Sequence, residues 1–344
     1  MVLIDRRAEP GDRIGESLPA AARPLLADLG LWEAFLADGH GRCHARRSAW
    51  GAPEPVELDA LADPHGAGWR LDRRRFEQRL RDAAQARGAA LIAPARAASA
   101  TRRDGGWTVA IAAPAQPVRA RVVIDAGGRG SRLLRQVAGR RIADDRLVCA
   151  WTHAPLRRPA AGLTYVESER GGWWYTAPLP CGRRLLAFHT DSDLEDGGAA
   201  MAALAERARR LPELAATIAD ADFASAAPAR LCAAHGSRLA AAAGEGWLAA
   251  GDAAMSFDPL SSQGLFHALY TGVKAAEAAD RMLDGAAGAG TAYAAALEPV
   301  WEAYRRHRAY YYGIERRWAG APFWRRRHAA DAASGRLARV AVPG

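Results

Sequence analysis

The chain has 344 residues, half of them hydrophobic and a quarter charged. This composition excludes a disordered or collagen-like protein, and the length suffices for two domains with separate cores. Lys and Arg number 47 against 38 Asp and Glu, a formal net charge of +9. The basic residues are almost all arginines spread through the chain. The one cluster, at residues 324–328, does not predict a nucleic-acid-binding surface.

The cysteines do not predict a metal site, because none has CxxC spacing or a nearby pair of histidines. We expect buried thiols in a reducing compartment. No apolar run approaches the roughly 18 residues that a membrane helix needs, and no signal-peptide pattern is present. A cytoplasmic protein with no membrane span and no metal is predicted. The four cysteines are Cys43, Cys149, Cys181 and Cys232.

The first predicted element is a short apolar run, residues 2–4, that ends in Asp5. It is typical of a buried parallel strand with an acid at its carboxyl end. In a dinucleotide-binding unit such an acid binds the adenosine ribose, and a GxGxxG turn lies about 20 residues before it. The sequence has no room for that turn ahead of Asp5. Gly244, Gly246 and Ala249 match the permissive pattern, but they precede an apolar run rather than follow one, so we interpret the match as accidental.

The next segments alternate between helix and strand patterns. Residues 18–36 are predicted to be helical with short interruptions, and a helix covering residues 76–87 starts after Asp72 and ends at Gly88. Apolar runs predict strands at residues 91–92, 107–111 and 118–124.

The last of these strands leads into a loop of small residues. It ends in Asp125-Ala126-Gly127-Gly128-Arg129-Gly130-Ser131, ahead of a helix predicted at Leu133. An acid followed by glycines at a strand end lets the backbone approach a ligand closely.

The middle of the chain has a different pattern. Residues 147–191 are β-rich and aromatic, which predicts a separate substrate layer, and residues 201–211 predict a helix. The pattern of the N-terminal part returns at residues 247–250. There an apolar run is followed by Gly251-Asp252 and by a predicted long helix over residues 264–283. The alternation predicts an α/β fold with a discontinuous nucleotide domain.

Three segments that are far apart in the sequence indicate the same kind of fold. They are the acid after residues 2–4, the loop at residues 125–131, and the segment 251–264. With residues 13–19 and 172–180 they resemble the FAD-dependent monooxygenases and halogenases of the hydroxybenzoate-hydroxylase-type fold. The resemblance implies a Rossmann-like FAD-binding domain of the glutathione-reductase type, a β-rich substrate domain and C-terminal helices. It places the FAD domain at residues 1–150 (with substrate-layer excursions near 40–68) and 241–290, the substrate domain at 151–240, and the helical segment at 291–344.

The resemblance also implies roles for single residues. Asp5 would bind the adenosine ribose, Asp125 would support the pyrophosphate region, and Asp252 would bind the ribityl hydroxyls. The full cofactor-binding set is Asp5, Arg6, Arg13, Gly15, Glu16, Ser17, Arg73, Asp125, Ala126, Gly128, Gly251, Asp252, Pro259, Gln263, Gly264 and Leu265. The substrate-facing set is Trp173, Tyr175, Pro178, Asp258, Ser261 and Ser262.

Elementary chemistry is compatible with these roles. A carboxylate at a strand end is a good acceptor for diol hydroxyls, and amides at the helix start near Gly264 can stabilise negative charge on a reduced flavin. No residue stands out as a catalytic acid or base with a partner.

Structural roles remain open for several of these residues. Asp5 and Asp125 are each equally well explained as helix N-caps, and Arg73 as the ion-pair partner of Asp72 or Glu77.

The aromatic strand also has a structural interpretation. Trp173, Trp174 and Tyr175 are typical of core residues, with Trp173 and Tyr175 on one face and Trp174 on the other. His189 is interpreted as a satisfied structural histidine, and residues 190–193 as a turn.

Departures from the family narrow the function. Halogenases of this fold carry a catalytic lysine in the first half of the chain, and the only lysine here is Lys274, so halogenase activity is disfavoured. The W-x-W-x-I-P signature of those halogenases is altered here, where residues 173–178 read Trp-Trp-Tyr-Thr-Ala-Pro. Trp50-Gly51, Gly68-Trp69, residues 256–259 and the aromatic stretch 310–324 resemble flavoproteins that modify a peptidyl tryptophan in quinone-cofactor biogenesis.

The missing glycine turn is the larger departure, because the fold would carry roughly 30 more residues ahead of Asp5. We expect the strand before Asp5 to have an unpaired inner edge, and a longer form of the chain to bind FAD.

The implied reaction is a hydroxylation. NAD(P)H, docking transiently, would reduce FAD; oxygen would add at the flavin C4a carbon, and the hydroperoxide would oxidise an aromatic small molecule or a peptidyl tryptophan. A flavin-dependent reductase, a truncated flavoprotein that binds no FAD, and a binding module remain as alternatives.

Overall fold

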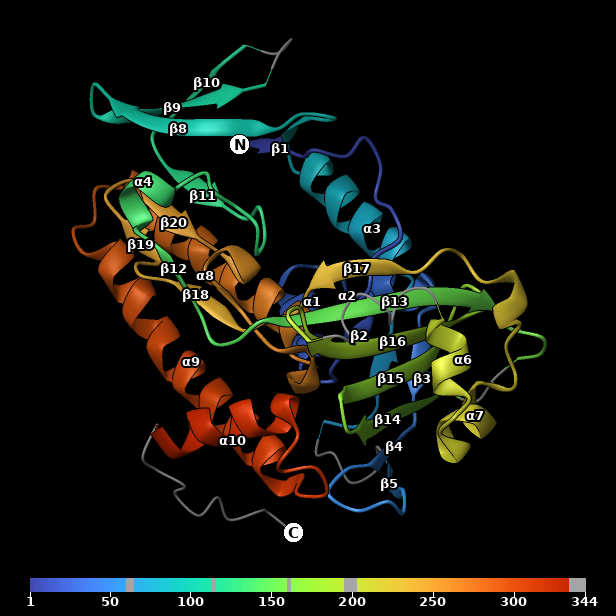
Figure 1. Ribbon diagram of the computed structural model, residues 1–344. Coiled ribbons are helices and arrows are strands. Elements are labelled where there is room, and N and C mark those ends of the chain that lie inside the picture. The colour runs from blue at the N-terminus through green and yellow to red at the C-terminus, as the bar shows by residue number, and fades with distance from the viewer. Residues whose placement is uncertain (60–64, 113–115, 160–161, 195–202, 334–344) are drawn as a thin grey trace.

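A computed structural model describes the chain except for residues 60–64, 113–115, 160–161, 195–202 and 334–344. Its largest element is a seven-stranded sheet in the order β17-β13-β16-β15-β14-β4-β5 (Figure 1). All neighbours in this sheet are antiparallel except β14 and β4. The strands are β17 (Arg230–Ala233), β13 (Leu147–Pro155), β16 (Arg183–Asp191), β15 (Gly172–Leu179), β14 (Leu163–Glu169), β4 (Ala45–Ala49) and β5 (Val56–Asp59).

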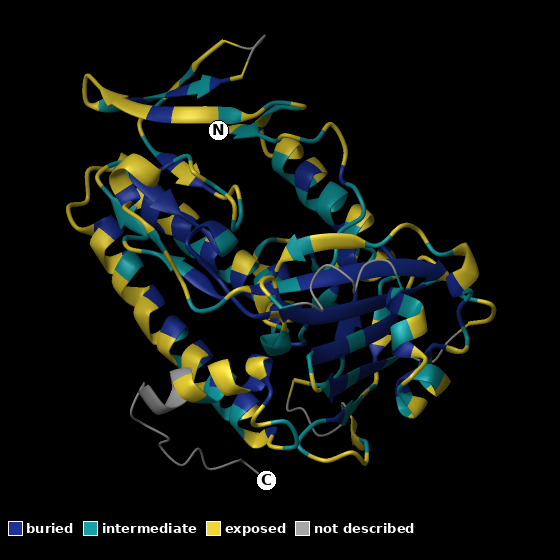
Figure 2. Cartoon of the chain, in the orientation of Figure 1, coloured by how far each residue is buried: buried dark blue, intermediate teal, exposed yellow. Residues whose placement is uncertain are grey.

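The two faces of this sheet pack against different elements because alternate side chains of a strand point to opposite sides. Trp174 lies in a core cluster with residues of α6 (Leu204–Ala208), α7 (Pro212–Ile218) and η2 (Phe223–Ser225). Trp173 and Tyr175 lie on the other face, with aromatic residues of the last two helices. The predicted division of these three aromatics between faces is therefore confirmed. Figure 2 shows that the central strands are buried almost throughout.

Parallel strand pairs form the second region. β1 (Val2–Ile4) pairs with β7 (Ala90–Ile92), and β11 (Val123–Asp125) pairs with β20 (Trp247–Ala249), which continues to β19 (Ala243–Gly244). Ile4 packs against the cluster that contains Val123 and Trp247, so the two pairs share a core.

Three small antiparallel sheets surround these regions. Their orders are β10-β9-β8, β12-β18-β21 and β2-β6-β3. The strands are β10 (Val118–Ala120), β9 (Gly106–Ile111), β8 (Ala97–Arg103), β12 (Arg141–Ala143), β18 (Ser237–Leu239), β21 (Met255–Ser256), β2 (Ser17–Leu18), β6 (Gly68–Arg70) and β3 (Gly41–Cys43).

The helices cover the parallel strands and one end of the large sheet. In Figure 1, α9 (Ala289–Ile314) runs along one side of the molecule and ends beside α10 (Pro322–Ala333). The remaining helices are α1 (Ala22–Asp28), α2 (Trp32–Ala37), α3 (Arg73–Ala86), α4 (Arg135–Ala138), η3 (Gly251–Ala253), η4 (Pro259–Ser261) and α8 (Gly264–Leu283). Among the described residues, no helix combines the length and apolar character needed to cross a membrane.

Most predicted elements are confirmed in position. α3 begins after Asp72, whose carboxylate accepts a hydrogen bond from the Arg75 amide at 3.1 Å, and α8 covers residues 264–283 as predicted. The helix predicted for residues 201–211 is shorter, at Leu204–Ala208, and residues 201–202 lie outside the described chain.

Three predictions need correction. Residues 118–124 do not form one strand: β10 pairs with β9 whereas β11 pairs with β20, so the chain changes sheets between them. Residues 190–193 are not all a turn, since Thr190 and Asp191 end β16. The cysteines are not all buried, because Cys181 is exposed.

The structure also shows where the glycines of the permissive pattern and the basic cluster lie. Gly244 and Gly246 belong to the hairpin between β19 and β20, so they form no phosphate-binding turn before a helix. The basic cluster near α10 is largely neutralised, because Arg326 and Arg327 both pair with Asp191. The proposed domain boundaries stay a prediction, and strands from residues 45–59 do join the large sheet.

Candidate cofactor site

Asp252 lies in η3, directly after β20, and is surrounded by positive charge. The Gly251 amide donates to Thr271 Oγ1 of α8 at 2.7 Å, which fixes the turn that presents Asp252. The Asp252 side chain is 39% exposed. Burial raises its pKa, and the guanidinium groups of four arginines oppose that rise: Arg129, Arg141, Arg73 and Arg13. The site thus offers one accessible carboxylate among four cations.

Main-chain carbonyls hold two of these arginines. Arg129 donates to the carbonyls of Ala233 and Phe257, and one of its nitrogens lies 3.9 Å from Asp252 Oδ2. Its buried Nε has no hydrogen-bond partner in the described chain. Arg141 donates to the Ala253 carbonyl beside Asp252.

The other two arginines connect α3 to the loop at residues 13–17. Glu77 pairs with both Arg73 and Arg13. Arg73 also donates to the carbonyls of Ile14 and Gly15. Arg73 therefore makes the ion pair of the structural interpretation and also shapes the predicted cofactor loop. In the same loop the Gly15 amide donates to the carboxylate of Glu16, which is buried, and Ser17 accepts from Arg70.

Asp125 organises its own loop and caps no helix. Its carboxylate accepts from the Gly127 amide at 2.9 Å and from the Ser131 hydroxyl. Gly128 has φ +81° and a side chain there would meet open space, while Ala126 is exposed. The N-cap interpretation is therefore wrong for Asp125, and the loop presents backbone without covering side chains.

Asp5 also caps no helix. Its carboxylate accepts from the Arg7 amide at 3.0 Å and pairs with Arg81 at 2.8 Å, while its side chain remains 37% exposed. Arg6 is exposed beside it. Arg73, Glu77 and Arg81 are spaced four residues apart on one face of α3. This face therefore runs from the loop near Asp252 to Asp5.

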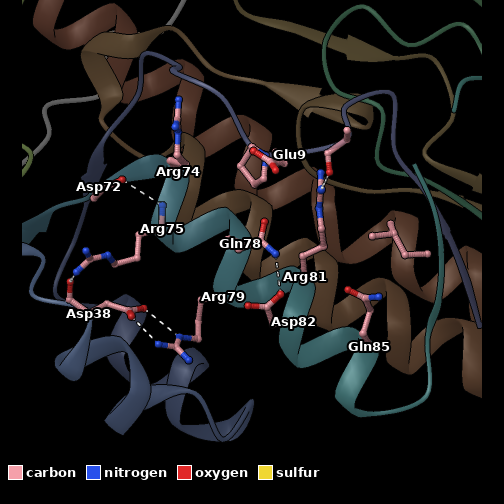
Figure 3. A pocket seen from close by; sticks show the side chains of 13 residues that line it. Glu9, Asp38, Asp72, Arg74, Arg75, Gln78, Arg79, Arg81, Asp82 and Gln85 are labelled. Atoms are coloured by element: carbon pink, nitrogen blue, oxygen red, sulfur yellow. Dashed lines mark hydrogen bonds and ion pairs between the residues drawn. The ribbon is translucent and has the colours of Figure 1, made fainter. Parts of the chain in front are cut away.

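A polar cavity of about 640 Å³ lies on the Arg81 side of α3 (Figure 3). Arg79 makes two hydrogen bonds to Asp38, and Gln78 bonds Asp82. Four arginines in its wall face four carboxylates, so the charges largely compensate one another. The residues are Arg74, Arg75, Arg79 and Arg81 with Glu9, Asp38, Asp72 and Asp82.

The start of α8 is open. Its N-cap residue, Gln263, makes no side-chain capping bond, and a Cβ on Gly264 would contact nothing within 4 Å. The first amides of this 20-residue helix are therefore available to an electronegative group. Leu265 is partly buried against the cluster around α1 and α2.

The loop before α8 is fixed by Asp258. Its carboxylate accepts from the Leu260 amide at 2.9 Å and from the Tyr312 hydroxyl at 2.8 Å, and it is only 1% exposed. Pro259 starts η4 and Ser261 bonds back to the Asp258 carbonyl. Ser262 has φ +53°. The structure thus places Asp258 in the interior rather than on a cavity wall.

The predicted substrate-facing aromatics are also enclosed. Trp173 is 1% exposed, stacks on His189 with ring centroids 3.6 Å apart, and donates to the Tyr312 hydroxyl at 3.1 Å. Pro178 is buried and Tyr175 partly buried in the same strand. The sequence predicts that the hydrogen bonds of His189 are satisfied, but its ring nitrogens have no well-aligned partner among the described residues.

Sequence reasoning missed Arg129, Arg141 and Tyr312 as parts of this region. Arg129 lies within the loop that was singled out, so its position next to β11 could have indicated it. Arg141 and Tyr312 reach the site through long-range packing that no local pattern reveals.

The residues fit FAD. Asp252 and Asp5 are carboxylates suited to diol hydroxyls, the arginines around Asp252 suit a diphosphate, and the open α8 start suits an electron-rich ring edge. No cluster of His, Cys, Asp and Glu suited to a metal ion occurs in the described part of the chain.

Comparisons with known proteins agree with this fit. LodB of Marinomonas mediterranea, named as an FAD-dependent oxidoreductase, is 27% identical over 96% of this chain and 91% of its own length. The flavin-dependent halogenase CmlS has a TM-score of 0.81 at 23% identity over 97% of this chain, which spans 64% of CmlS. The peptidyl tryptophan dihydroxylase QhpG, essential for tryptophylquinone cofactor biogenesis, has a TM-score of 0.77 at 25% identity, covering 95% of this chain and 72% of QhpG.

These likenesses show a mixed α/β fold of the FAD-dependent halogenase and monooxygenase type, and the enzyme class is that of FAD-dependent oxidoreductases. The family model for tryptophan halogenases matches residues 35–342. The chain belongs to the tryptophan halogenase family.

Proposed function

We propose that the protein is an NAD(P)H-dependent flavin monooxygenase that oxidises an aromatic substrate, most specifically a tryptophan side chain of a peptide. The observation that carries the proposal is the accessible Asp252 carboxylate among four arginines beside the open start of α8. The similarity to QhpG supports the peptidyl substrate.

In this proposal the chain binds and orients the cofactor, and FAD supplies the hydride acceptor and the oxygen chemistry. Asp252 accepts from the ribityl hydroxyls and Asp5 from the adenosine ribose. Arg129 and Arg141 offset the diphosphate charge, and the first amides of α8 stabilise negative charge on the reduced ring.

The finer fold assignment belongs to the same proposal. The pairs β1·β7 and β11·β20 would be two parts of one Rossmann-like FAD-binding sheet. Support comes from the parallel pairing within each pair and from Ile4, which packs into the core of the second pair.

Halogenation is disfavoured by the position of the only lysine. Lys274 lies on α8, where its ammonium group pairs with Glu277 at 2.8 Å, and both side chains are substantially exposed. It is therefore engaged on the helix surface rather than held in a substrate cavity.

Oxygen uptake by the flavin-loaded protein tests the function. We expect uptake with NADH or NADPH to increase on addition of a tryptophan-containing peptide, and the peptide to gain oxygen in its mass spectrum. Gain of chlorine or bromine in the presence of halide would instead assign halogenation. Reduction of a substrate without oxygen uptake would assign a reductase.

A further inference from the structure

Two cysteines face each other across neighbouring strands at the edge of the large sheet. Cys149 of β13 and Cys232 of β17 are register partners. The Ala234 amide donates to the Leu147 carbonyl two residues away, so the cysteines occupy a hydrogen-bonded pair of the ladder. The Cα atoms of such a pair are about 5.5 Å apart, a typical separation for a disulfide.

Both side chains lie on the same face of the sheet. Each packs in the cluster that contains Trp151 and Trp173, and each thiol shifts the pKa of the other. The Cys149 thiol also donates to the Ala150 carbonyl at 3.8 Å. The two sulfur atoms are therefore neighbours in the reduced protein.

The two thiols differ in reactivity. Cys232 lies on the edge strand and is partly exposed, whereas Cys149 is buried. The neighbouring Cys149 thiol lowers the pKa of Cys232, and the Arg129 charge lowers it further; burial raises the pKa of Cys149. Because the thiolate is the nucleophile, Cys232 reacts first and Cys149 second.

Arg129 ties this pair to the candidate cofactor site. It donates to the carbonyl of Ala233, the residue after Cys232, and it lies 3.9 Å from Asp252. Of the other polar groups near the pair, Glu16 raises the pKa of Cys149 and Trp151 lowers the pKa of Cys232. Burial lowers the pKa of His189, opposite Cys149 on β16, to about 3. Arg129 is thus the cation that acts on Cys232.

We propose that Cys232 and Cys149 form a peroxide-reactive dithiol in the wall of the cofactor site. The Cys232 thiolate attacks hydrogen peroxide, the O–O bond breaks, and a sulfenic acid and hydroxide form; the hydroxide takes a proton from solvent and becomes the first water. The sulfur of Cys149 then attacks the Cys232 sulfur, the S–O bond breaks, and a disulfide and a second water form. The two sulfurs together supply the two electrons that reduce the peroxide.

Peptide mapping of the reduced full chain after peroxide treatment tests the proposal, and it needs no flavin. Cys181 is first replaced by serine because it is exposed, and Cys43, buried and bonded to Arg70, serves as the internal control thiol. We expect a Cys149–Cys232 linked peptide while Cys43 stays reduced. Wild-type protein with Cys181 alkylated gives the same readout without a substitution.

Variants resolve the order of events. In Cys149→Ser we expect a sulfenic acid at Cys232, trapped by dimedone, and in Cys232→Ser little trapping at Cys149. Arg129→Gln should move the pH midpoint of Cys232 alkylation upward and slow alkylation several-fold at neutral pH. Absence of the linked peptide, equal oxidation of Cys43, or equal trapping at Cys149 would overturn the dithiol; an unchanged pH midpoint would overturn the role of Arg129.

Discussion

Burial keeps three histidine side chains uncharged in the folded protein. His189 stacks on Trp173, and burial lowers its pKa to about 3. Burial also lowers the pKa values of His153 and His267 to about 4. The folded protein therefore keeps all three rings uncharged at pH values where an unfolded chain binds protons.

This difference predicts a loss of stability in mild acid. The unfolded chain takes up protons as the pH falls below about 6.5 while the folded chain does not, so each histidine removes up to about 1.4 kcal/mol per pH unit until its folded pKa is reached. His189→Phe keeps a ring against Trp173 and removes one such group. Between pH 6 and pH 5, urea unfolding should show a shallower decline than in the wild type.

His307→Phe is the matched control, because His307 is exposed on α9. It should leave the pH dependence of the unfolding free energy as in the wild type. Equal slopes for His189→Phe and wild type would contradict the buried neutral state of His189.

At the scale of elements, α9 holds the loop that precedes α8. Tyr304, Arg308 and Tyr312 are four residues apart and therefore share one face of α9. All three contact Asp258: Tyr304 through the Asp258 amide, Arg308 at 3.7 Å and Tyr312 at 2.8 Å from its carboxylate. Helix α9 thus fixes the loop that would lie beside a bound flavin.

Loss of one hydroxyl should weaken this attachment. Tyr312→Phe leaves one oxygen of the buried Asp258 carboxylate and the Trp173 indole N–H without the Tyr312 hydroxyl. We expect a loss of about 2 kcal/mol in the free energy of unfolding, because unsatisfied buried groups carry their full desolvation cost. Tyr311→Phe, at an exposed neighbour, should change it by less than about 0.5 kcal/mol. Equal effects of the two substitutions in urea titrations would contradict the role of the Asp258 contacts.

Elements with complete local signals were the ones that the sequence predicted well. α8 has a glycine at its start and sustained helical periodicity, and α3 has Asp72 as its N-cap. The strand at residues 118–124 was mispredicted because one apolar run serves two sheets, and pairing partners far along the chain decide where it divides.

For the whole molecule, the candidate site forms where the parallel strands, α3 and the start of α8 meet the large sheet. Motif reasoning found the acids at the carboxyl ends of β1, β11 and β20 because each lies at or just after the end of an apolar run. It could not find Arg141, which reaches Asp252 from β12, or the enclosure of Trp173 by α9 and α10. Those features depend on how distant segments pack, and composition or periodicity carries no record of that packing.

The central claim is that Asp252 and its surrounding arginines hold FAD. Its direct test is titration of the chain with FAD, followed by tryptophan fluorescence and by the flavin absorption spectrum, for wild type and for Asp252→Asn. Asp284→Asn, an exposed acid at the other end of α8, is the matched control. The account predicts saturable binding by wild type and the control, weakened about 10- to 100-fold in Asp252→Asn through loss of charge-assisted hydrogen bonds. Equal affinity of Asp252→Asn and wild type, or no binding by the wild type, would contradict it.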